Sequence, residues 1–143
     1  GLGDVYKRQP FDGAEYDYYT TTKGVLEKVK AHVDDVDFAV QPEVLSLLSS
    51  GNFGRYADEK GEMKVCFISN NDITGGNSGS AMFNSKGELL GLAFDGNWEA
   101  MGSDILYEPK MQRTIGVDVR YILFIIEKYG KAGNLIQELN ILN

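Results

Sequence analysis

The sequence predicts a mostly β fold that ends in a helix. Short apolar segments typical of strands are separated by clusters of Gly, Asn, Asp and Ser, which favour turns. A glycine-rich segment links two of these strands, and an apolar stretch at helical spacing runs from Asp118 to a stop at Gly130. The 143 residues suffice for one domain with a hydrophobic core, and the apolar share of 43% is ordinary for a globular protein.

Residues 10–60 are mixed and polar, and they predict one strand followed by helices. Aromatic and β-branched residues dominate residues 17–22, which favours a strand. Apolar residues at helical spacing follow, and Pro42 opens a short helix that is expected to end near Gly51. The three aspartates within residues 34–37 are interpreted as a solvated loop, because no regular metal-ligand spacing accompanies them.

The later part of the chain alternates strands with turns, and its final strand leads into the helix. The two strands around the turn at residues 85–88 are expected to form a β-hairpin. The predicted elements are a strand over 64–69, a glycine-rich loop over 70–80, a strand over 81–84, a turn over 85–88, a strand over 89–94, a long loop over 95–112, a strand over 113–117 and a helix over 118–129.

Composition excludes several classes of function. The net charge of −7 argues against nucleic acid or an anionic membrane as partner, because no basic patch is available to neutralise phosphates. No apolar segment approaches the roughly 20 residues that a membrane-spanning helix needs. The single cysteine, Cys66, lies in an apolar segment interpreted as a buried strand and is assigned a structural role. With one cysteine and one histidine there is no zinc pattern, so neither a metal nor a cofactor is predicted.

Residues 1–9 are set aside as a non-native leader. Their sequence resembles one found at the ends of unrelated chains that were assembled from short sequence reads. Because the chain opens on Gly1 rather than an initiator methionine, the lack of a signal peptide here carries little information.

Residues 74–80, with the sequence Thr-Gly-Gly-Asn-Ser-Gly-Ser, carry the most informative chemistry. An acyl-transfer serine needs an exposed hydroxyl on a tight turn and backbone N–H groups aimed at the oxyanion that forms. Glycines beside Ser78 permit such a turn, and the N–H groups of Gly76 and Ser78 would form the oxyanion hole. One alternative is a turn without chemistry, since Gly, Asn and Ser dominate turns. A phosphate-binding loop is a weaker alternative, because no Lys-Ser or Lys-Thr follows the glycines.

After Ser78 the elements follow the order of chymotrypsin-like peptidases: a hairpin, a pocket-wall loop, a last strand and a C-terminal helix. The sequence around this order resembles the dipeptidyl-peptidase 7 and 11 family of serine peptidases, serine peptidase family forty-six, over about residues 10–143. One departure is Ala81, where that family often has a proline, and this change should alter local rigidity more than chemistry. The resembling segments are Asn-Asp-Ile-Thr-Gly-Gly-Asn-Ser-Gly-Ser at 71–80, Gly-Leu-Ala-Phe-Asp-Gly-Asn-Trp-Glu-Ala-Met at 91–101, Gln-Arg-Thr-Ile-Gly-Val-Asp-Val-Arg-Tyr at 112–121, and shorter ones at 18–21 and 53–56.

The resemblance implies a chymotrypsin-like double β-barrel with a large helical domain inserted. Residues 10–60 would then hold the end of the helical insert and the segment that joins it to the barrel. Residues 61–143 would hold the C-terminal part of the second barrel with the final helix. The implied activity is that of a serine exopeptidase, an aminopeptidase-type hydrolase that releases dipeptides. Its partners would be peptides with free N-termini, a homodimer is compatible with it, and its location would be periplasmic, cell-surface or secreted.

The same resemblance assigns roles to individual residues. Ser78 would be the nucleophile, and the Asp95 carboxylate would bind the α-ammonium group of the substrate in a charge-assisted pair. On the residues alone, an ordinary strand-end or loop carboxylate is the alternative for Asp95. Members of the family with acidic specificity carry an arginine where this chain has Gly96. Because glycine supplies no charge and leaves space, the pocket is predicted to suit apolar or bulky residues at the second substrate position.

Three neighbouring residues are given no catalytic role. Asp72 lies six residues before Ser78, where chymotrypsin-fold enzymes specific for basic residues place a pocket-floor aspartate. That position is discounted, because the family motif contains this aspartate in members without basic specificity. Trp98 and Glu99 are interpreted as structural residues around the pocket.

The chain lacks an evident general base. His32, the single histidine, lies in a polar segment and is interpreted as a surface residue rather than the base. In the resembling family the histidine and aspartate of the triad come from the first barrel, so this chain alone is expected to be inactive. The main hypothesis is therefore a fragment of a serine dipeptidyl-peptidase. The alternatives are a non-catalytic β-domain and a different chymotrypsin-fold endopeptidase.

Overall fold

The computed structural model describes residues 17–97, 100 and 112–142, so the predicted leader and the pair Trp98 and Glu99 lie outside the described residues. The chain divides into two compact units. The sheet unit comprises residues 1–20 and 65–119, and the helical unit comprises residues 21–64 and 120–143.

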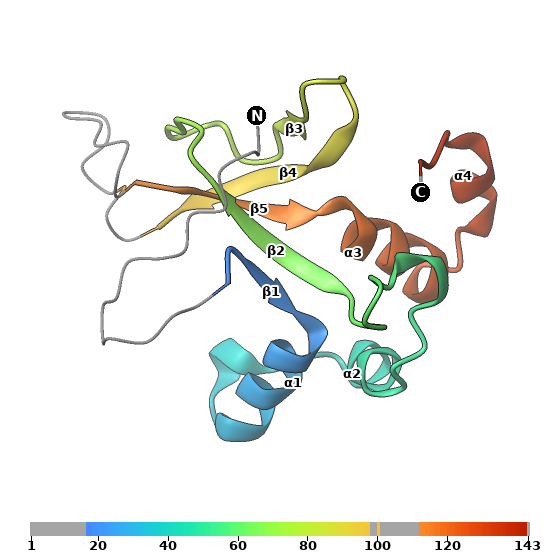
Figure 1. Ribbon diagram of the computed structural model, residues 1–143. Coiled ribbons are helices and arrows are strands. Elements are labelled where there is room, and N and C mark those ends of the chain that lie inside the picture. The colour runs from blue at the N-terminus through green and yellow to red at the C-terminus, as the bar shows by residue number, and fades with distance from the viewer. Residues whose placement is uncertain (1–16, 98–99, 101–111, 143) are drawn as a thin grey trace. The chain divides into compact units, whose positions relative to one another are not determined.

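The sheet unit is built on five strands in the order β1-β2-β5-β4-β3 (Figure 1). β5 pairs antiparallel with β2 on one side and with β4 on the other, and β3 pairs antiparallel with β4. Among the described residues, the last strand in the sequence is therefore the central strand of the sheet, and it joins the β1-β2 pair to the β4-β3 pair. The strands are β1 (Tyr19–Thr21), β2 (Lys64–Ser69), β3 (Ala81–Phe83), β4 (Leu89–Gly96) and β5 (Thr114–Asp118).

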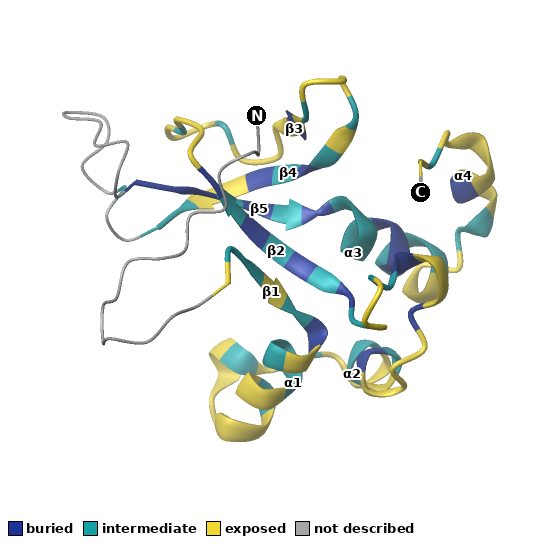
Figure 2. Cartoon of the chain, viewed as in Figure 1, coloured by how far each residue is buried: buried dark blue, intermediate teal, exposed yellow. Residues whose placement is uncertain are grey.

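The core of the sheet unit is formed by the buried residues Phe67, Met82 and Ala93. Figure 2 shows buried positions along β2, β4 and β5. Two glycines make room for this core. A Cβ atom on Gly116 would lie 2.6 Å from the sulfur of Met82 and 3.0 Å from the Phe67 ring. On Gly91 it would lie 2.0 Å from a backbone carbonyl oxygen of β5 and 2.8 Å from the same ring. Glycine at these two positions is required by packing, since real Cβ atoms do not approach other atoms so closely.

The predicted strands are confirmed as elements of the structure, with three differences of detail. β1 is only three residues long. β4 continues to Gly96, two residues beyond the predicted end at residue 94. Residues of β2 alternate between half-buried and buried, and Cys66 is half-buried. The strand interpreted as buried is thus buried on one face only, and Cys66 lies on its less well covered face.

The helical unit contains the helices predicted after residue 22, and residues 119–129 are helical as expected. Its last turns are π-helical over Ile125–Tyr129, where the Gly130 N–H donates to the Ile125 carbonyl at 2.9 Å. A further short helix after Gly130 was not predicted. The elements are α1 (Thr22–Ala31), a 3₁₀ turn (Val36–Phe38), α2 (Pro42–Ser49), a 3₁₀ turn (Gly54–Tyr56), α3 (Val119–Phe124), the π-helical segment and α4 (Gly133–Glu138).

Aromatic side chains form the centre of the helical unit. The buried ring of Phe124 meets Phe53 and Tyr56 edge to face, with centroid separations of 5.7 and 6.0 Å. The Tyr56 hydroxyl donates a hydrogen bond to the Glu127 carboxylate on the π-helical segment. This bond connects the 3₁₀ turn that carries Tyr56 to residues 125–129, which are far away in the sequence.

The connection between α1 and α2 is strongly exposed. Its aspartates at residues 34–37 are all exposed, which confirms the predicted solvated loop. Val33 and Val36 in the same connection are 76% and 84% exposed.

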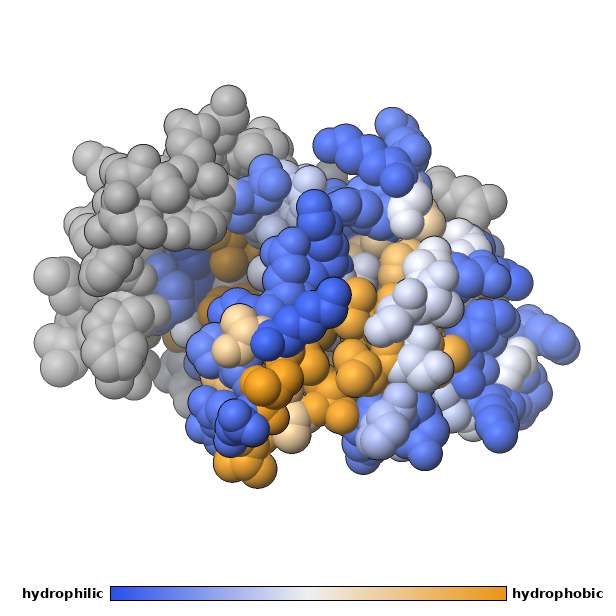
Figure 3. Space-filling model, turned by 90° about the horizontal axis from the view of Figure 1, so that it is seen from below, coloured by the Kyte–Doolittle hydropathy of each residue, from blue (hydrophilic) through white to orange (hydrophobic). Residues whose placement is uncertain are grey.

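Seen from the side of α1 and α2, hydrophobic residues gather in a band between hydrophilic ones (Figure 3). The imidazole of His32 stacks on the Phe38 ring, with centroids 4.2 Å apart.

The Tyr56–Glu127 contact shifts both pKa values. Burial, followed by the bond to Glu127, raises the pKa of the Tyr56 hydroxyl from 10.0 to about 12. The Tyr56 hydroxyl, followed by Lys128 at 3.1 Å, lowers the pKa of the Glu127 carboxyl below its ordinary value of 4.5. A lowered acid pKa means that the contact stabilises the fold above about pH 4.5 and loses this effect as the pH falls through the folded value.

We expect Tyr56→Phe in the complete protein to lower the free energy of unfolding of this region by about 1.5–3 kcal/mol near neutral pH, because it removes a hydrogen bond to a charged group. The ring packing against Phe124 is preserved by the substitution. Tyr129→Phe is the matched control, because it removes a hydroxyl that bonds the neutral side chain of Gln41. The control should cost less, about 0.5–1.5 kcal/mol. Hydrogen exchange of residues 53–56 and 119–129 in urea measures both effects.

The pH dependence of these two variants should differ. The Tyr56→Phe effect should be flat from about pH 5 to pH 9 and should shrink towards pH 3, as Glu127 becomes protonated in both proteins. The Tyr129→Phe effect should not change over the acid range. A Tyr56→Phe effect that grew as the pH fell would show that the Glu127 carboxylate is not the relevant partner.

Candidate active site

The segment that carries Ser78 is built from two consecutive turns that share Asn77. The Asn77 N–H donates to the Thr74 carbonyl at 3.1 Å, and the Ser80 N–H donates to the Asn77 carbonyl at 2.9 Å. The third residue of each turn is a glycine with a positive φ, +94° at Gly76 and +87° at Gly79. This conformation is what a type II turn requires at that position, and it explains why glycines occupy both places.

Hydrogen bonds to Ala93 anchor this loop on β4. The Gly79 N–H donates to the Ala93 carbonyl at 2.7 Å, and the Ala93 N–H donates to the Ser80 carbonyl at 2.9 Å. The ladder between β3 and β4 therefore extends beyond Ala81 into the loop. The residue that follows Ser78 is thereby held in a defined place on the sheet.

Ser78 is exposed, and its hydroxyl donates to the Phe94 carbonyl at 3.2 Å. In the part of the chain that the structure describes, the N–H groups of Gly76 and Ser78 donate to no acceptor. The loop thus presents a hydroxyl and two unpaired backbone donors within three residues. An acyl-transfer site needs these groups, one to attack a carbonyl and the others to stabilise the negative charge on its oxygen.

A β-bulge in β4 determines how Asp95 is presented. Ala93 pairs with Gly116 in β5, but the next pair is Asp95 with Ile115, so Phe94 is an extra residue in the strand. Without the bulge, Asp95 would lie on the buried face with Ala93, because alternate residues of a strand share a face. With it, Asp95 lies on the face of Ile115 and is exposed.

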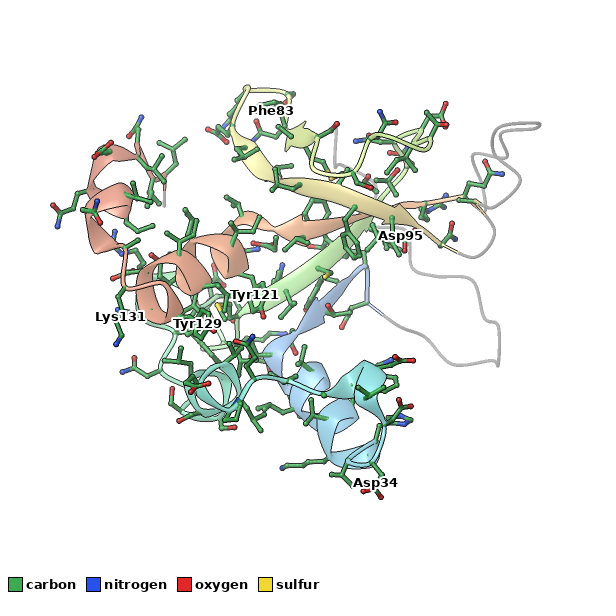
Figure 4. The ribbon with its side chains drawn as sticks, turned by 180° about the vertical axis from the view of Figure 1, so that it is seen from behind. Asp34, Phe83, Asp95, Tyr121, Tyr129 and Lys131 are labelled. Carbon is green, nitrogen blue, oxygen red and sulfur yellow. The ribbon has the colours of Figure 1, made fainter. Side chains whose placement is uncertain are left out.

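The Asp95 side chain, labelled in Figure 4, lies near the end of β4. Its carboxylate has capacity for a further partner. One of its oxygens accepts the neighbouring Gly96 N–H at 2.8 Å. Among the described residues it makes no other hydrogen bond or ion pair. An exposed carboxylate of this kind can accept hydrogen bonds from a cationic group such as an ammonium ion.

Gly96 follows on the opposite, better-buried face, where it pairs with Thr114. A Cβ atom on Gly96 would lie 2.9 Å from the Cβ of Ala100, 3.8 Å from a carbonyl oxygen of Arg113 and 3.9 Å from Ile73. The expectation that Gly96 leaves free space is wrong for the first carbon of a side chain. Any larger residue here requires Ala100 to move.

Among the described residues, the others considered from the sequence make no hydrogen bond with the side chain of Ser78 or Asp95. Asp72 is exposed in the loop that follows β2. His32 belongs to the helical unit, whereas Ser78 belongs to the sheet unit. Burial raises the pKa of the Cys66 thiol, which disfavours the reactive thiolate. Among residues 17–97, 100 and 112–142, no group of His, Cys, Asp and Glu side chains could hold a metal ion, and no helix is long and apolar enough to cross a membrane.

Comparison with known proteins identifies the family. The model of the family described as Peptidase S46 matches residues 1–141. The chain belongs to the peptidase S46 family. Dipeptidyl-peptidase 7 of Porphyromonas gingivalis is 56% identical over 140 residues, which cover 98% of this chain and 19% of that relative. The Asp/Glu-specific dipeptidyl-peptidase of the same organism is 45% identical over 139 residues, covering 97% and 19%. The chain therefore spans about a fifth of the length of these curated relatives.

Solved structures of the peptidase S46 family have the same fold over this region. The crystal structure of Porphyromonas endodontalis DPP11 in complex with the dipeptide Arg-Glu matches with a TM-score of 0.85 and 42% identity, covering 94% of this chain and 19% of that one. A second crystal structure of Porphyromonas endodontalis DPP11 matches with a TM-score of 0.83 and 44% identity, covering 91% of this chain and 19% of that one. The predicted family and the mostly antiparallel sheet with helices are confirmed.

Three features of the site were missed in the sequence. The side chain of Asn77 accepts the Thr74 N–H at 2.9 Å, and the preference of asparagine for such turns was an available signal. The bulge at Phe94 has no local signal, since Phe94 fits a regular strand equally well. The short distance between Ala100 and Gly96 has no signal in the sequence either, because it depends on contacts that exist only in the folded chain.

Proposed function

We propose that this chain supplies the nucleophile segment of a serine dipeptidyl-peptidase that removes dipeptides from the free N-termini of peptides. The observation that carries the proposal is the Ser78 hydroxyl flanked by two unpaired N–H groups, in a chain whose relatives are named dipeptidyl-peptidases. The complete enzyme would have the chymotrypsin-like double barrel expected from the sequence, in a periplasmic or cell-surface location. Family membership does not favour the alternative of a non-catalytic β-domain.

In this mechanism Ser78 attacks the carbonyl carbon of the second substrate residue. Its hydroxyl proton passes to a general base, which the remainder of the complete enzyme would supply together with the carboxylate that orients it. The N–H groups of Gly76 and Ser78 bind the oxyanion, and loss of one such donor typically costs about 10²–10³ in rate. The leaving amine takes the proton, and water then releases the dipeptide from the Ser78 ester.

We expect Ser78→Ala in the complete enzyme to abolish turnover and to preserve the fold, because the attacking oxygen is lost. Ser80→Ala is the matched control, since Ser80 is an exposed serine of the same loop and, within the described part of the chain, only its backbone makes hydrogen bonds. The measurement is kcat/KM for a dipeptide reporter, together with mapping of a serine-directed phosphonate adduct by mass spectrometry. An adduct on Ser80 or any other serine would refute the assignment.

We propose that Asp95 binds the α-ammonium group of the substrate. The bulge at Phe94 turns the carboxylate to an exposed face two residues beyond Ala93, and Ala93 itself holds the Ser78 loop. A carboxylate at a fixed place near the nucleophile can hold the N-terminus at a set separation from the scissile bond. This arrangement explains why cleavage would occur after two residues.

Asp95→Asn in the complete enzyme should reduce kcat/KM for free-amine peptides strongly, because truncating one partner of a desolvated charge pair costs about 2–5 kcal/mol. Asp72→Asn is the control, since it removes an exposed carboxylate of the same unit and should leave kcat/KM nearly unchanged. The decisive comparison uses free and N-acetylated versions of one peptide. A wild type that cleaves both equally well would exclude the exopeptidase function.

For specificity, we propose a preference for apolar residues at the second substrate position. Gly96 brings no positive charge, and burying a carboxylate without a partner is unfavourable. The chain is also more similar to a relative whose name states no acidic specificity, at 56% identity, than to an Asp/Glu-specific one, at 45%. The crowding by Ala100 means that glycine at 96 also preserves the local backbone packing.

Gly96→Arg should shift preference towards Asp and Glu at the second position, because the guanidinium can pair with a carboxylate. The Cβ at 96 would clash with Ala100, so the single variant should gain little and the double variant Gly96→Arg/Ala100→Gly should gain more. Ala100→Gly alone is the control and should keep the apolar preference. The readout is kcat/KM for reporters with Leu or Asp at the second position. A wild type that prefers Asp would contradict the proposed pocket.

A further inference from the structure

Asn77 uses three of its polar groups to define the Ser78 loop. Its N–H and its carbonyl close the two turns on either side of it, towards Thr74 and from Ser80. Its side-chain oxygen accepts the Thr74 N–H at 2.9 Å, so Thr74 and Asn77 are joined by two hydrogen bonds in opposite directions. Asn77 is half-buried, whereas Ser78 and the glycines beside it are exposed.

Asn77 lies in the sequence between the two residues whose N–H groups are proposed as oxyanion donors. The Gly76 N–H precedes Asn77 and the Ser78 N–H follows it. Gly75 and Gly76 leave the first turn with a large conformational freedom, which a single backbone hydrogen bond restricts only in part. The second bond, from Thr74 to the Asn77 side chain, closes a ring around both glycines. It limits the orientations that the Gly76 N–H can adopt.

We propose that Asn77 is a positioning residue, whose side chain holds the Gly76 and Ser78 N–H groups in the orientation that stabilises the oxyanion. This inference rests on the proposed role of Ser78 as nucleophile. Donors contribute most when their orientation is set before the reaction, because no reorganisation is then needed as charge develops. Loss of the Asn77 side-chain oxygen should therefore slow the chemical step and leave substrate binding nearly unchanged.

The chain offers a matched control for this effect in Asn84. The Asn84 side-chain oxygen accepts the Lys86 N–H at 2.9 Å and the Glu88 N–H at 3.0 Å in the turn between β3 and β4. The chemistry is the same as at Asn77, in the same unit, but the turn carries no donor proposed for the oxyanion. Removing the Asn84 side chain should lower stability at least as much without affecting kcat.

The test compares Asn77→Ala, Asn77→Asp and Asn84→Ala in the complete enzyme. Asn77→Ala should lower kcat by about 10- to 100-fold, less than full loss of one oxyanion donor, with little change in KM. The rate at which a dipeptidyl phosphonate modifies Ser78 should fall by a similar factor, because that adduct also carries an oxyanion-like oxygen. Asn77→Asp keeps an acceptor for the Thr74 N–H, so it should recover most of the lost kcat. Asn84→Ala should match the wild type in kcat.

The possible outcomes separate this inference from the function on which it rests. If the phosphonate modifies Ser78 equally fast in the wild type and in Asn77→Ala, the positioning role is refuted and the function stands. If the wild type is not modified at Ser78, the proposed function fails, and this inference fails with it. If the Asn77→Ala enzyme does not fold, the Asn77→Asp enzyme provides the test. A folded Asn77→Asp enzyme whose kcat is as low as that of the Ser78→Ala enzyme would overturn the proposal.

Discussion

The geometry of the candidate site depends on the backbone of one residue, Ala93. Its N–H and carbonyl both bond to the Ser78 loop, through Ser80 and Gly79, while its Cα pairs with Gly116 of the central strand. A side-chain substitution cannot remove these bonds, because they belong to the main chain. The loop is therefore coupled to the packing of the sheet, and the two glycines that admit Phe67 and Met82 contribute to the site without lying in it.

Local patterns explain how much of the fold was predictable. Alternating apolar residues and turn-forming clusters indicated the strands, and the stop at Gly130 indicated the end of a helix, since each signal acts within a few residues. The order of strands is set by contacts between distant segments, so the central place of β5 had no such signal. Residues 21–64 and 120–143 form one unit. Dividing the sequence into consecutive domains cannot reveal this, because the two segments are far apart in the chain.

The candidate site was predictable to an unequal degree. Ser78 stood out because a serine between glycines with special backbone conformations is a local arrangement with a chemical reason. Asp95 was indicated by family resemblance alone, since a carboxylate near the end of a strand looks like any other. Its exposure follows from the bulge at Phe94, which depends on the register between β4 and β5. Gly96 was identified for its lack of charge, while the contact with Ala100 appeared only in three dimensions.

The extra residue of the bulge has a link of its own to the site, because the Phe94 carbonyl accepts the Ser78 hydroxyl. Deleting Phe94 would leave Asp95 opposite Ile115 in a strand with regular alternation, so the carboxylate would stay on its exposed face. The deletion would, however, remove the carbonyl to which Ser78 donates. A substitution of the Phe94 side chain would keep this acceptor, since it belongs to the main chain. Related chains should therefore vary in residue type at position 94 and keep the one-residue bulge between Ala93 and Asp95.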